Sequence, residues 1–217
     1  TIVYDRRPIE LTTLRRDVAT DGRRAVAAFT DAWRADASRR DFTMNALYAD
    51  RTGRVFDLVG GVEDARAGRV RFVGDAPARV REDYLRILRY FRFQAWYGRP
   101  PPDSEALAAV REGRGGLAGI ARERVRQELL KLLAAPDPVP ACRLMDEAGI
   151  LAIVLAGPGD PEGLARLLLL RPEAGPVTRL AALAAPDADP EALAGTLRLS
   201  KAETRTLLTF RQLAAEM

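Results

Sequence analysis

The sequence of 217 residues carries a formal net charge of +4, and 47% of its residues are hydrophobic, which is enough for a buried core and excludes wholesale disorder. It contains no histidine and one cysteine, so this chain cannot hold a Ser-His-Asp site, a His-Cys zinc site or an internal disulfide. Neither a transmembrane span nor a signal peptide is expected, because no apolar run approaches about 18 residues and the segment 1–10 lacks a basic-then-apolar pattern.

The positive charge is carried almost entirely by arginine, since lysine occurs only as Lys131 and Lys201. The planar guanidinium pairs with phosphate in two places at once, so this bias is compatible with RNA or nucleotide phosphates. A high genomic G+C content would also replace lysine by arginine, and composition does not separate the two explanations. Any metal would have to be held by carboxylates, which suit magnesium or manganese. Cys142 lies in an apolar-periodic segment and is predicted to be a small core residue.

The first part of the chain reads as short extended segments separated by turns. The predicted elements are a hairpin over 1–14, a mobile loop over 15–30, a short helix over 31–38, and strands over 44–50 and 55–58. We expect these strands to form the remnant of a small mixed sheet.

Helical patterns dominate from residue 62 onward. The strongest predicts one helix over 78–97, in which Tyr84, Ile87, Leu88, Phe91 and Ala95 form an apolar stripe that requires a core. Further helices are predicted to end near Gly113 and to span 121–134, 138–149, 161–171, 176–185, 190–197 and 200–217. The predicted fold class is therefore α+β, mostly α.

The opposite side of the 78–97 helix is charged, with Glu82, Asp83, Arg86, Arg89 and Arg92. Glu82 and Arg86 are four residues apart, and Asp83 and Arg86 are three apart, so each acid is predicted to lie beside the arginine. On an arbitrary helix such residues form solvated ion pairs, worth a few tenths of a kcal/mol each.

Four segments taken in order resemble one family, the bacterial-type (class II) CCA-adding tRNA nucleotidyltransferases and the related bacterial poly(A) polymerases. These segments are IELTTLR at 9–15, RRDFTMNAL at 39–47, DLVGGVED at 57–64 and REDYLRILRYFRF at 81–93. The resemblance implies a cytoplasmic enzyme that transfers CMP and AMP from CTP and ATP to tRNA 3′ ends. It also implies a partial nucleotidyltransferase head over 1–62, a neck with a nucleotide-selecting helix over 63–118, and a helical RNA-binding body over 119–217.

By this resemblance Asp83 and Arg86 read the base, Glu82 steadies Arg86, and Arg89 faces the phosphates. Cytosine and adenine both offer an exocyclic amine beside a ring-nitrogen acceptor, which a carboxylate next to an arginine complements. Uracil and guanine would leave polar groups mismatched, at a cost of about 1–3 kcal/mol each. The alternative is that these residues form simple helix ion pairs.

In RRDFTMNAL the resemblance implies that Asp41 binds the ribose hydroxyls, and that Arg40 and Asn45 hold ribose or phosphate oxygens. The alternative is a turn in which Asp41 caps Thr43 and Asn45 satisfies backbone groups.

In DLVGGVED the resemblance implies a hinge between head and neck at Asp57, Gly60 and Gly61. A plain turn in which the glycines adopt positive φ requires the same backbone, so the sequence does not separate a hinge from a turn.

The chain departs from the family pattern at its start. The glycine-rich stretch and the Asp-x-Asp pair that holds two metal ions in the family do not precede 9–15. We therefore expect the front of the head and the C-terminal tail to be missing, the Mg²⁺ ligands to lie mainly upstream, and the 217 residues to be inactive alone. Glu10 is a candidate third catalytic acid, and no metal ligand is assigned. Asp17 and Asp21 are predicted loop residues.

The one Asp-x-Asp in the chain, Asp187 and Asp189, and the separate Asp137, are predicted turn and cap residues. CCA addition, A-only addition, CC-only addition and poly(A) synthesis share the four segments. A non-catalytic RNA-binding helical module is the alternative from another class. The implied partners are the tRNA 3′ end, CTP and ATP, without a membrane. An exposed strand edge at the start would also allow a homodimer.

Overall fold

The computed structural model describes residues 2–5, 7–9, 12–20 and 25–215. Its strands are β1 (Ile2–Tyr4), β2 (Arg7–Ile9), β3 (Arg15–Thr20), β4 (Ala25–Phe29), β5 (Leu47–Ala49) and β6 (Val55–Asp57). Its helices are α1 (Trp33–Ser38), η1 (Thr43–Asn45), α2 (Gly61–Ala67), α3 (Ala76–Glu82), α4 (Leu85–Tyr97), α5 (Ser104–Gly113), η2 (Arg114–Gly119), α6 (Arg122–Leu133), α7 (Val139–Glu147), α8 (Leu151–Leu155), α9 (Pro161–Leu170), α10 (Pro176–Leu183), α11 (Pro190–Thr196) and α12 (Lys201–Ala215). The predicted fold class, α+β and mostly α, is confirmed.

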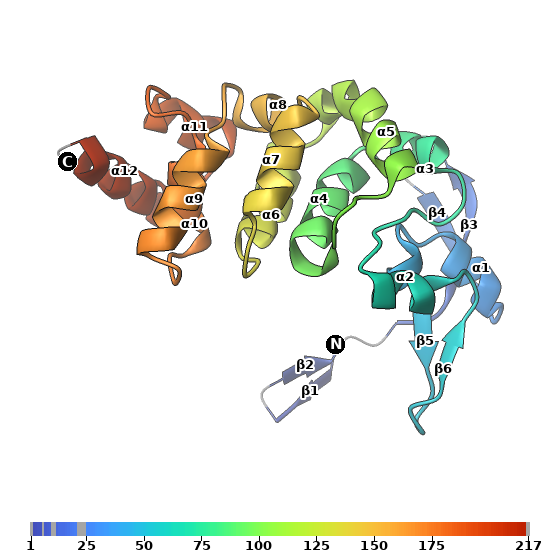
Figure 1. Cartoon of the computed structure of the whole chain (residues 1–217). Helices are drawn as coiled ribbons and strands as arrows, with labels where there is room; N and C mark the ends of the chain where they lie inside the picture. The colour runs from blue at the N-terminus through green and yellow to red at the C-terminus, as the bar shows by residue number, and fades with distance from the viewer. Residues whose placement is uncertain (1, 6, 10–11, 21–24, 216–217) are drawn as a thin grey trace.

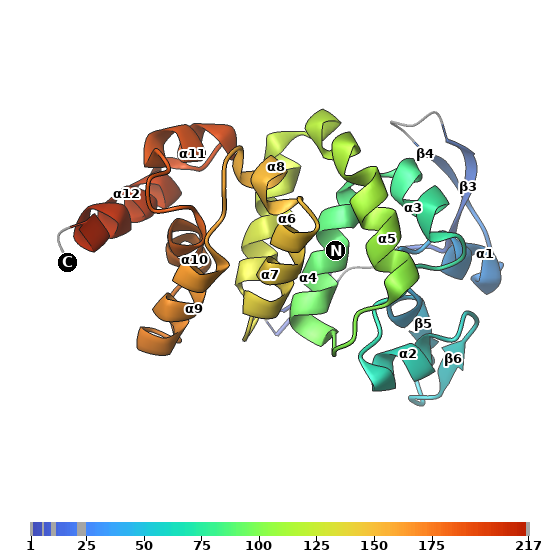
Figure 2. The same cartoon turned by 45° about the horizontal axis from the view of Figure 1, so that its top comes forward.

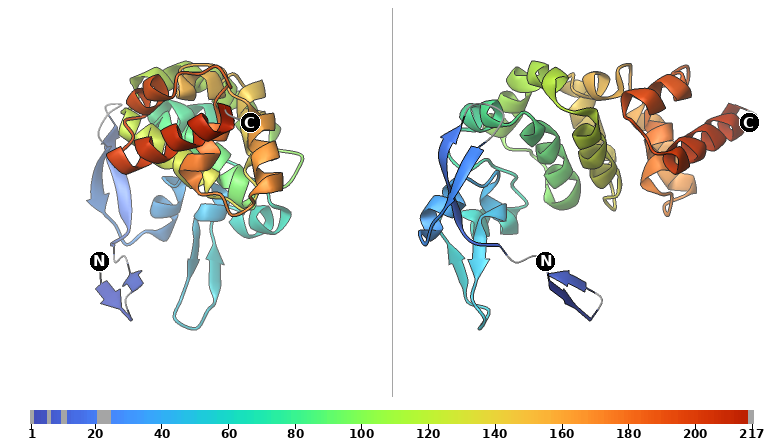
Figure 3. Two further views of the ribbon diagram at one scale, coloured as in Figure 1. Left: turned by 90° about the vertical axis from the view of Figure 1, so that its left-hand side faces the viewer. Right: turned by 180° about the vertical axis from the view of Figure 1, so that it is seen from behind.

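The helices from α3 to α12 follow one another in a row that leads away from the strand-containing end of the molecule (Figure 1). The same row is visible after rotation, with α4, α6 and α7 in its middle and α12 at its far end (Figure 2). The β1–β2 hairpin stands apart from the other elements in both further views (Figure 3). The described residues include no helix that is long and apolar enough to cross a membrane.

The strands pair as three separate two-stranded antiparallel sheets, β1–β2, β3–β4 and β5–β6, instead of the expected single mixed sheet. A hairpin is present at the N-terminus as predicted, but it is shorter than 1–14, because Ile2–Tyr4 pairs with Arg7–Ile9 and residues 12–14 are not in a strand. The predicted loop over 15–30 is wrong, because β3 and β4 pair there, with Asp17 opposite Ala27. The charged run Arg15 to Asp17 and the lack of a sustained period hid the Val, Thr and Phe content that favours strands. Asp21 lies outside the described residues.

The predicted helix over 78–97 is two helices, α3 and α4, because Asp83 is extended (φ −153°, ψ 105°). Its side chain accepts a hydrogen bond from the Leu85 amide at 3.0 Å, in the first turn of α4. Aspartate competes for backbone donors in this way, and the competition favours a break over a continuous helix. The sequence pattern, which records only the spacing of apolar residues, did not reveal it.

The apolar stripe of α4 lies in the core as predicted. Ile87, Leu88 and Phe91 are almost completely buried, and Tyr84 and Ala95 pack at its edge. This core continues through α6 and α7 to the C-terminal helices, so one apolar interior connects the whole row. Cys142 is part of it, as predicted, and burial raises the pKa of its thiol to about 12.

The carboxylates that were predicted to act in turns and caps do so. Asp137 accepts from the Val139 amide, and Asp189 accepts from the Glu191 amide at the start of α11. Asp187 lies in the turn that precedes α11.

The two glycines between β6 and α2 serve different purposes. Gly60 has φ +81°, where a side chain is strained, as the turn interpretation required. Gly61 is needed for space, since a Cβ there would lie 2.1 Å from the Thr43 carbonyl oxygen. Asp57 fixes the turn by accepting backbone amides from Val59, Gly60 and Gly61 on Oδ1, and one from Val62 on Oδ2.

We predict that Gly61→Ala lowers the free energy of unfolding by about 1–3 kcal/mol, because the new methyl group must displace the Thr43 backbone. Chemical denaturation measures the change. Gly119→Ala is the matched control, since a Cβ at that glycine meets no atom within 4 Å. Equal stabilities of the two variants would contradict the close approach of α2 to Thr43.

Candidate functional site

A cluster around Asp41 joins the RRDFTMNAL segment to α4. Arg89 donates from Nε to Asp41 Oδ2 at 2.6 Å, and its Nη2 pairs with the same oxygen. Asp41 Oδ1 accepts from the Phe42 amide and from Asn45 Nδ2, both at 3.0 Å. Because a carboxylate offers about four acceptor positions, these donors occupy the buried group fully. The structure therefore brings Asp41, Asn45 and Arg89 together. In the alternative interpretation Asp41 would cap Thr43, but it accepts from the Phe42 amide instead.

A second cluster lies at the α3–α4 junction. Glu82 pairs with Arg86, as predicted, and also with Arg79 at 2.7 Å. Arg86 Nη1 additionally donates to the Arg79 carbonyl at 2.8 Å. Burial opposes ionisation of Glu82, but its bonds to Arg86 and Arg79 lower the pKa of its carboxyl. Both bonds of the Arg86 guanidinium are thus made by Nη1. Within the described residues its Nε and Nη2 groups have no hydrogen-bond partner.

The predicted side-by-side placement of Asp83 and Arg86 is wrong as a side-chain ion pair. Asp83 Oδ2 instead accepts from Arg124 Nη2 at 3.0 Å, at the start of α6. The break before α4 turns Asp83 away from the helical i, i+3 geometry, although the Arg86 amide still donates to the Asp83 carbonyl at 2.9 Å. The two side chains therefore leave the same turn of chain, each oriented by its own partner.

The sequence did not single out Asp36, a buried carboxylate that binds both arginines of the RRDFTMNAL segment (39–47), called the RRD segment from here on. It accepts from the Arg15 amide, the Tyr48 hydroxyl and the guanidinium groups of Arg39 and Arg40. Arg40 was predicted to face ribose or phosphate, and its side chain is still about one-third exposed. The signal that could have found Asp36 is its spacing of three and four residues from Arg39 and Arg40, which directly follow a short helix.

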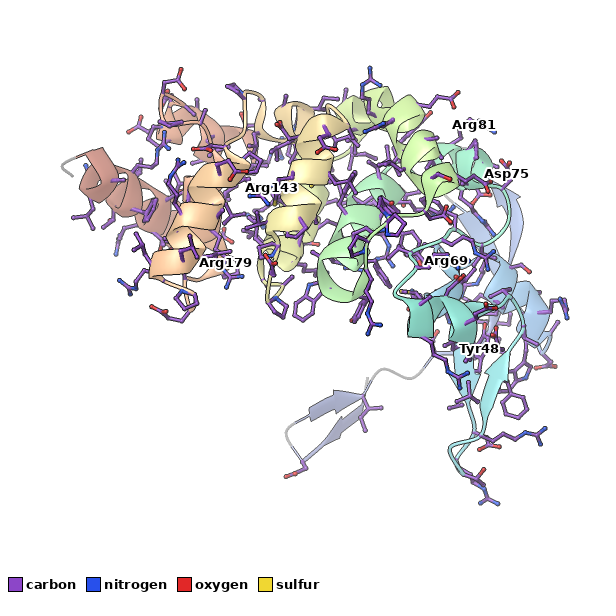
Figure 4. All side chains as sticks on the ribbon, viewed as in Figure 1. Tyr48, Arg69, Asp75, Arg81, Arg143 and Arg179 are labelled. Carbon is purple, nitrogen blue, oxygen red and sulfur yellow. The ribbon has the colours of Figure 1, made fainter. Side chains whose placement is uncertain are left out.

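The environment of Asp36 also perturbs two pKa values. Burial alone would raise the pKa of the Asp36 carboxyl, but the bonds from Arg15, Tyr48, Arg39 and Arg40 hold it far below its usual range. Burial, together with the bond to Asp36, raises the pKa of Tyr48 to about 12. Tyr48 is on β5, close to α2, where Figure 4 labels it.

A third buried carboxylate, Asp64, ties the DLVGGVED segment to the RRD segment. Its Oδ2 accepts from the Thr43 hydroxyl at 2.6 Å and from Arg71 Nε at 2.9 Å. The backbone of 41–43 also pairs with that of 71–73, through the Thr43 amide to the Arg71 carbonyl and the Val73 amide to the Asp41 carbonyl. The DLVGGVED segment, the RRD segment and residues 71–73 are thereby fixed against one another.

The carboxylates of this site do not fit a magnesium ion. Asp36, Asp41 and Asp64 are each bonded to one or more arginines. Over the described residues there is no group of three or more His, Cys, Asp or Glu side chains that could hold a metal. Glu10, the candidate catalytic acid, lies outside the described residues.

Two family models match the chain. The poly A polymerase head domain covers residues 1–71, and the probable RNA and SrmB-binding site of polymerase A covers residues 102–162. The mitochondrial CCA tRNA nucleotidyltransferase 1 of Danio rerio is 42% identical over 201 residues, which are 89% of this chain and 46% of that protein. The CCA-adding enzyme of Geobacillus stearothermophilus is 38% identical over 161 residues, 72% of this chain and 39% of that protein. The chain thus spans less than half the length of these curated relatives.

Among solved structures, the crystal structure of the Bacillus stearothermophilus CCA-adding enzyme in complex with CTP is similar with a TM-score of 0.80 and 27% identity. The similarity covers 100% of this chain and 54% of that one. The complex of the Thermotoga maritima CCA-adding enzyme with tRNA has a TM-score of 0.65 at 20% identity, which concerns the fold alone.

We predict that Asp36→Asn lowers the free energy of unfolding at pH 7 by about 3 kcal/mol, because Arg39 and Arg40 lose their buried partner. Since the pKa of Asp36 is lowered in the folded state, its stabilisation is complete above the ordinary value of about 3.9 and is lost as the pH falls further. The difference between variant and parent should therefore narrow below about pH 4, as denaturant titrations at several pH values measure.

The control is Glu173→Gln, which removes one partner of the solvent-exposed pair with Arg171 and should leave stability unchanged at pH 7. A difference between Asp36→Asn and its parent that stays constant from pH 7 to acid would show that the charge of Asp36 is not what stabilises the RRD segment.

Proposed function

Because the chain belongs to the family of class II CCA-adding enzymes and poly(A) polymerases, of which it covers the head and RNA-binding regions, we propose that it is part of a template-independent RNA nucleotidyltransferase. The proposed reaction transfers CMP and AMP from CTP and ATP to the 3′ end of tRNA, with release of pyrophosphate. Support comes from the relatives named as CCA tRNA nucleotidyltransferase and CCA-adding enzyme, and from the similar structure that was solved with CTP.

The observation that carries the proposal is the arrangement of Asp83 and Arg86 at the break between α3 and α4. Asp83 is an acceptor fixed by Arg124 and by the Leu85 amide. Arg86 is a donor fixed by Glu82 and the Arg79 carbonyl. Side chains that are held in place before a ligand arrives lose little entropy on binding, which suits a site that selects cytosine and adenine by hydrogen bonds.

The sugar and phosphates are assigned to the Asp41 cluster, one turn further along α4. Asn45 is exposed and Arg89 is partly exposed, whereas Asp41 is buried and already holds both. We therefore propose that Asn45 and Arg89 meet the ribose and phosphates, together with Arg40. A direct bond from Asp41 to a ribose hydroxyl requires one of its present donors to move aside.

For the organisation of the chain we propose a partial head over 1–62, a neck over 63–118 and an RNA-binding body over 119–217. The carboxylate-bound arginines of the site come from both of the first two units, Arg40 from the proposed head and Arg86 and Arg89 from the proposed neck. We propose that the protein is cytoplasmic. We also propose that it can form a homodimer, and light scattering tests this by measuring its mass in solution.

We predict that Asp83→Ala abolishes the preference for CTP and ATP over UTP and GTP, a change of about tenfold in relative affinity. Calorimetry with the four nucleotides and magnesium measures it. Asp83→Ser keeps a hydrogen-bond acceptor for the Leu85 amide without a carboxylate, so it separates lost base selection from a weakened α4. Asp146→Ala, at an exposed position on α7, is the control. Unchanged preference in both Asp83 variants would refute the base-reading role.

We further propose that the 217 residues alone do not add nucleotides. The only Asp-x-Asp in the sequence, Asp187 and Asp189, forms a turn and a helix cap instead of a metal site. The test is incorporation of labelled CTP and ATP into tRNA that lacks its 3′ end, with magnesium present. No incorporation above background is expected, and robust incorporation would overturn this part of the proposal.

A further inference from the structure

An aromatic and basic pocket lies between the C-terminal half of α4 and α6, outside the site described above. Its volume is about 280 Å³. The residues that line it are Arg92, Phe93, Trp96, Tyr97, Lys131 and Ala134. We call it the Trp96 pocket.

The rings of the Trp96 pocket are exposed but held in place. Trp96 is 43% exposed and Tyr97 57% exposed. Trp96 Nε1 donates to the Lys131 carbonyl at 2.8 Å, which fixes the indole against α6. The Tyr97 ring lies 5.5 Å from that of Phe93 and 6.4 Å from that of Trp96, measured between centroids. Large rings that are both accessible and ordered form a surface on which another flat ring can stack.

The charge around the rings is positive. Arg92 and Lys131 share one acid, Glu128, at 3.0 Å and 3.8 Å. Glu128 itself is buried, whereas the Lys131 side chain is 59% exposed. Two bases against one buried acid leave a positive edge beside the aromatic surface, which favours an anionic ligand over an apolar helix or a second basic copy of this chain.

The Trp96 pocket continues the proposed nucleotide site along one face of α4. Arg86, Arg89, Phe93 and Tyr97 follow each other at i, i+3, i+7 and i+11, so they share a face. The Arg89 guanidinium lies over the Phe93 ring, with its carbon 5.9 Å from the centroid. From Arg89 to Trp96 the helix advances about 10 Å, at about 1.5 Å per residue. A stacked strand rises about 3.4 Å per nucleotide, so about three nucleotides span this distance.

We propose that the Trp96 pocket binds a base of single-stranded RNA, about three nucleotides from the position of the incoming nucleotide. The base stacks on Trp96 and Tyr97, and Lys131 meets a neighbouring phosphate. Aromatic rings beside cations are the arrangement that binds single strands without a strong sequence preference. The distance from the incoming nucleotide rests on the proposed function, whereas stacking of single-stranded RNA on the rings does not.

Trp96 can report on its own occupancy. The chain has two tryptophans, so Trp33→Phe leaves Trp96 as the only one. In that background, a six-nucleotide single-stranded RNA should quench the Trp96 fluorescence saturably, and a blunt-ended RNA hairpin of the same composition should bind at least tenfold more weakly. Tyr97→Ala should weaken binding of the single strand about tenfold. Lys131→Gln should reduce the salt dependence of the dissociation constant.

A second set of variants follows binding by anisotropy of a labelled RNA. Trp96→Ala should weaken binding about tenfold, and Trp96→Phe, which keeps a ring, should weaken it less than threefold. Phe29→Ala, at an exposed aromatic residue on β4, is the matched control and should change nothing. Thermal melts verify that each variant folds.

Equal affinity of parent, Tyr97→Ala and Trp96→Ala for the single strand would overturn the proposal, as would equal quenching by the hairpin. Quenching that depends on protein concentration without RNA would assign the pocket to a protein contact and would also overturn it. Nucleotide preference in calorimetry is a separate readout. If that preference is absent while single-stranded RNA binds through Trp96, the proposed function fails and the pocket assignment stands. If the preference is present while single-stranded RNA does not bind through Trp96, the pocket assignment fails and the proposed function stands.

Discussion

The arginines of α4 connect the parts of this molecule. Arg86, Arg89 and Arg92 are spaced three residues apart, and each meets a carboxylate of a different origin: Glu82 on α3, Asp41 in the RRD segment, and Glu128 on α6. The other side of α4 carries the apolar stripe that holds the helix in the core. One helix is thus tied to α3, to the RRD segment and to α6 at the same time. A pair of this kind, once partly buried, costs more to break than an exposed one, because the remaining charge stays desolvated.

Local spacing revealed the contacts that a helix makes with itself and failed for the contacts between elements. The apolar stripe and the pair of Glu82 with Arg86 follow from a period of 3.6 residues, and both were predicted. The partners of Arg89 and Asp83 lie 48 and 41 residues away in sequence, so no periodicity could identify them. The break at Asp83 depends on one hydrogen bond to the Leu85 amide, which outweighs a weak helix preference at a single position.

Two arginines of the C-terminal helices, Arg179 and Arg211, bind backbone carbonyl groups. Arg179 is buried and donates to the carbonyls of Leu133, Ala135 and Pro172. It lies on α10 and connects that helix to the C-terminal ends of α6 and α9 (Figure 4). Arg211 does the same for the loop after α10, with bonds that include the carbonyls of Ala185 and Ala188. Carbonyl groups at helix ends lack partners within the helix, so arginine satisfies several at once. Arg179 and Arg211 are therefore used within the fold, which composition alone does not reveal.

The segment over 57–62 has the contacts of a fixed turn. Asp57 accepts four backbone amides, and burial opposes the resulting lowering of its pKa without cancelling it. Gly61 lies so close to the Thr43 carbonyl that no Cβ fits between them, and Asp64 accepts a hydrogen bond from the Thr43 hydroxyl. A hinge requires residues that can change φ and ψ without losing many contacts. Here a change at Gly61 would separate α2 from the RRD segment. In contrast, Gly74, between the paired 71–73 segment and α3, has φ +72°, and a Cβ there would meet no atom within 4 Å. The backbone at Gly74 is therefore less constrained than the turn over 57–62.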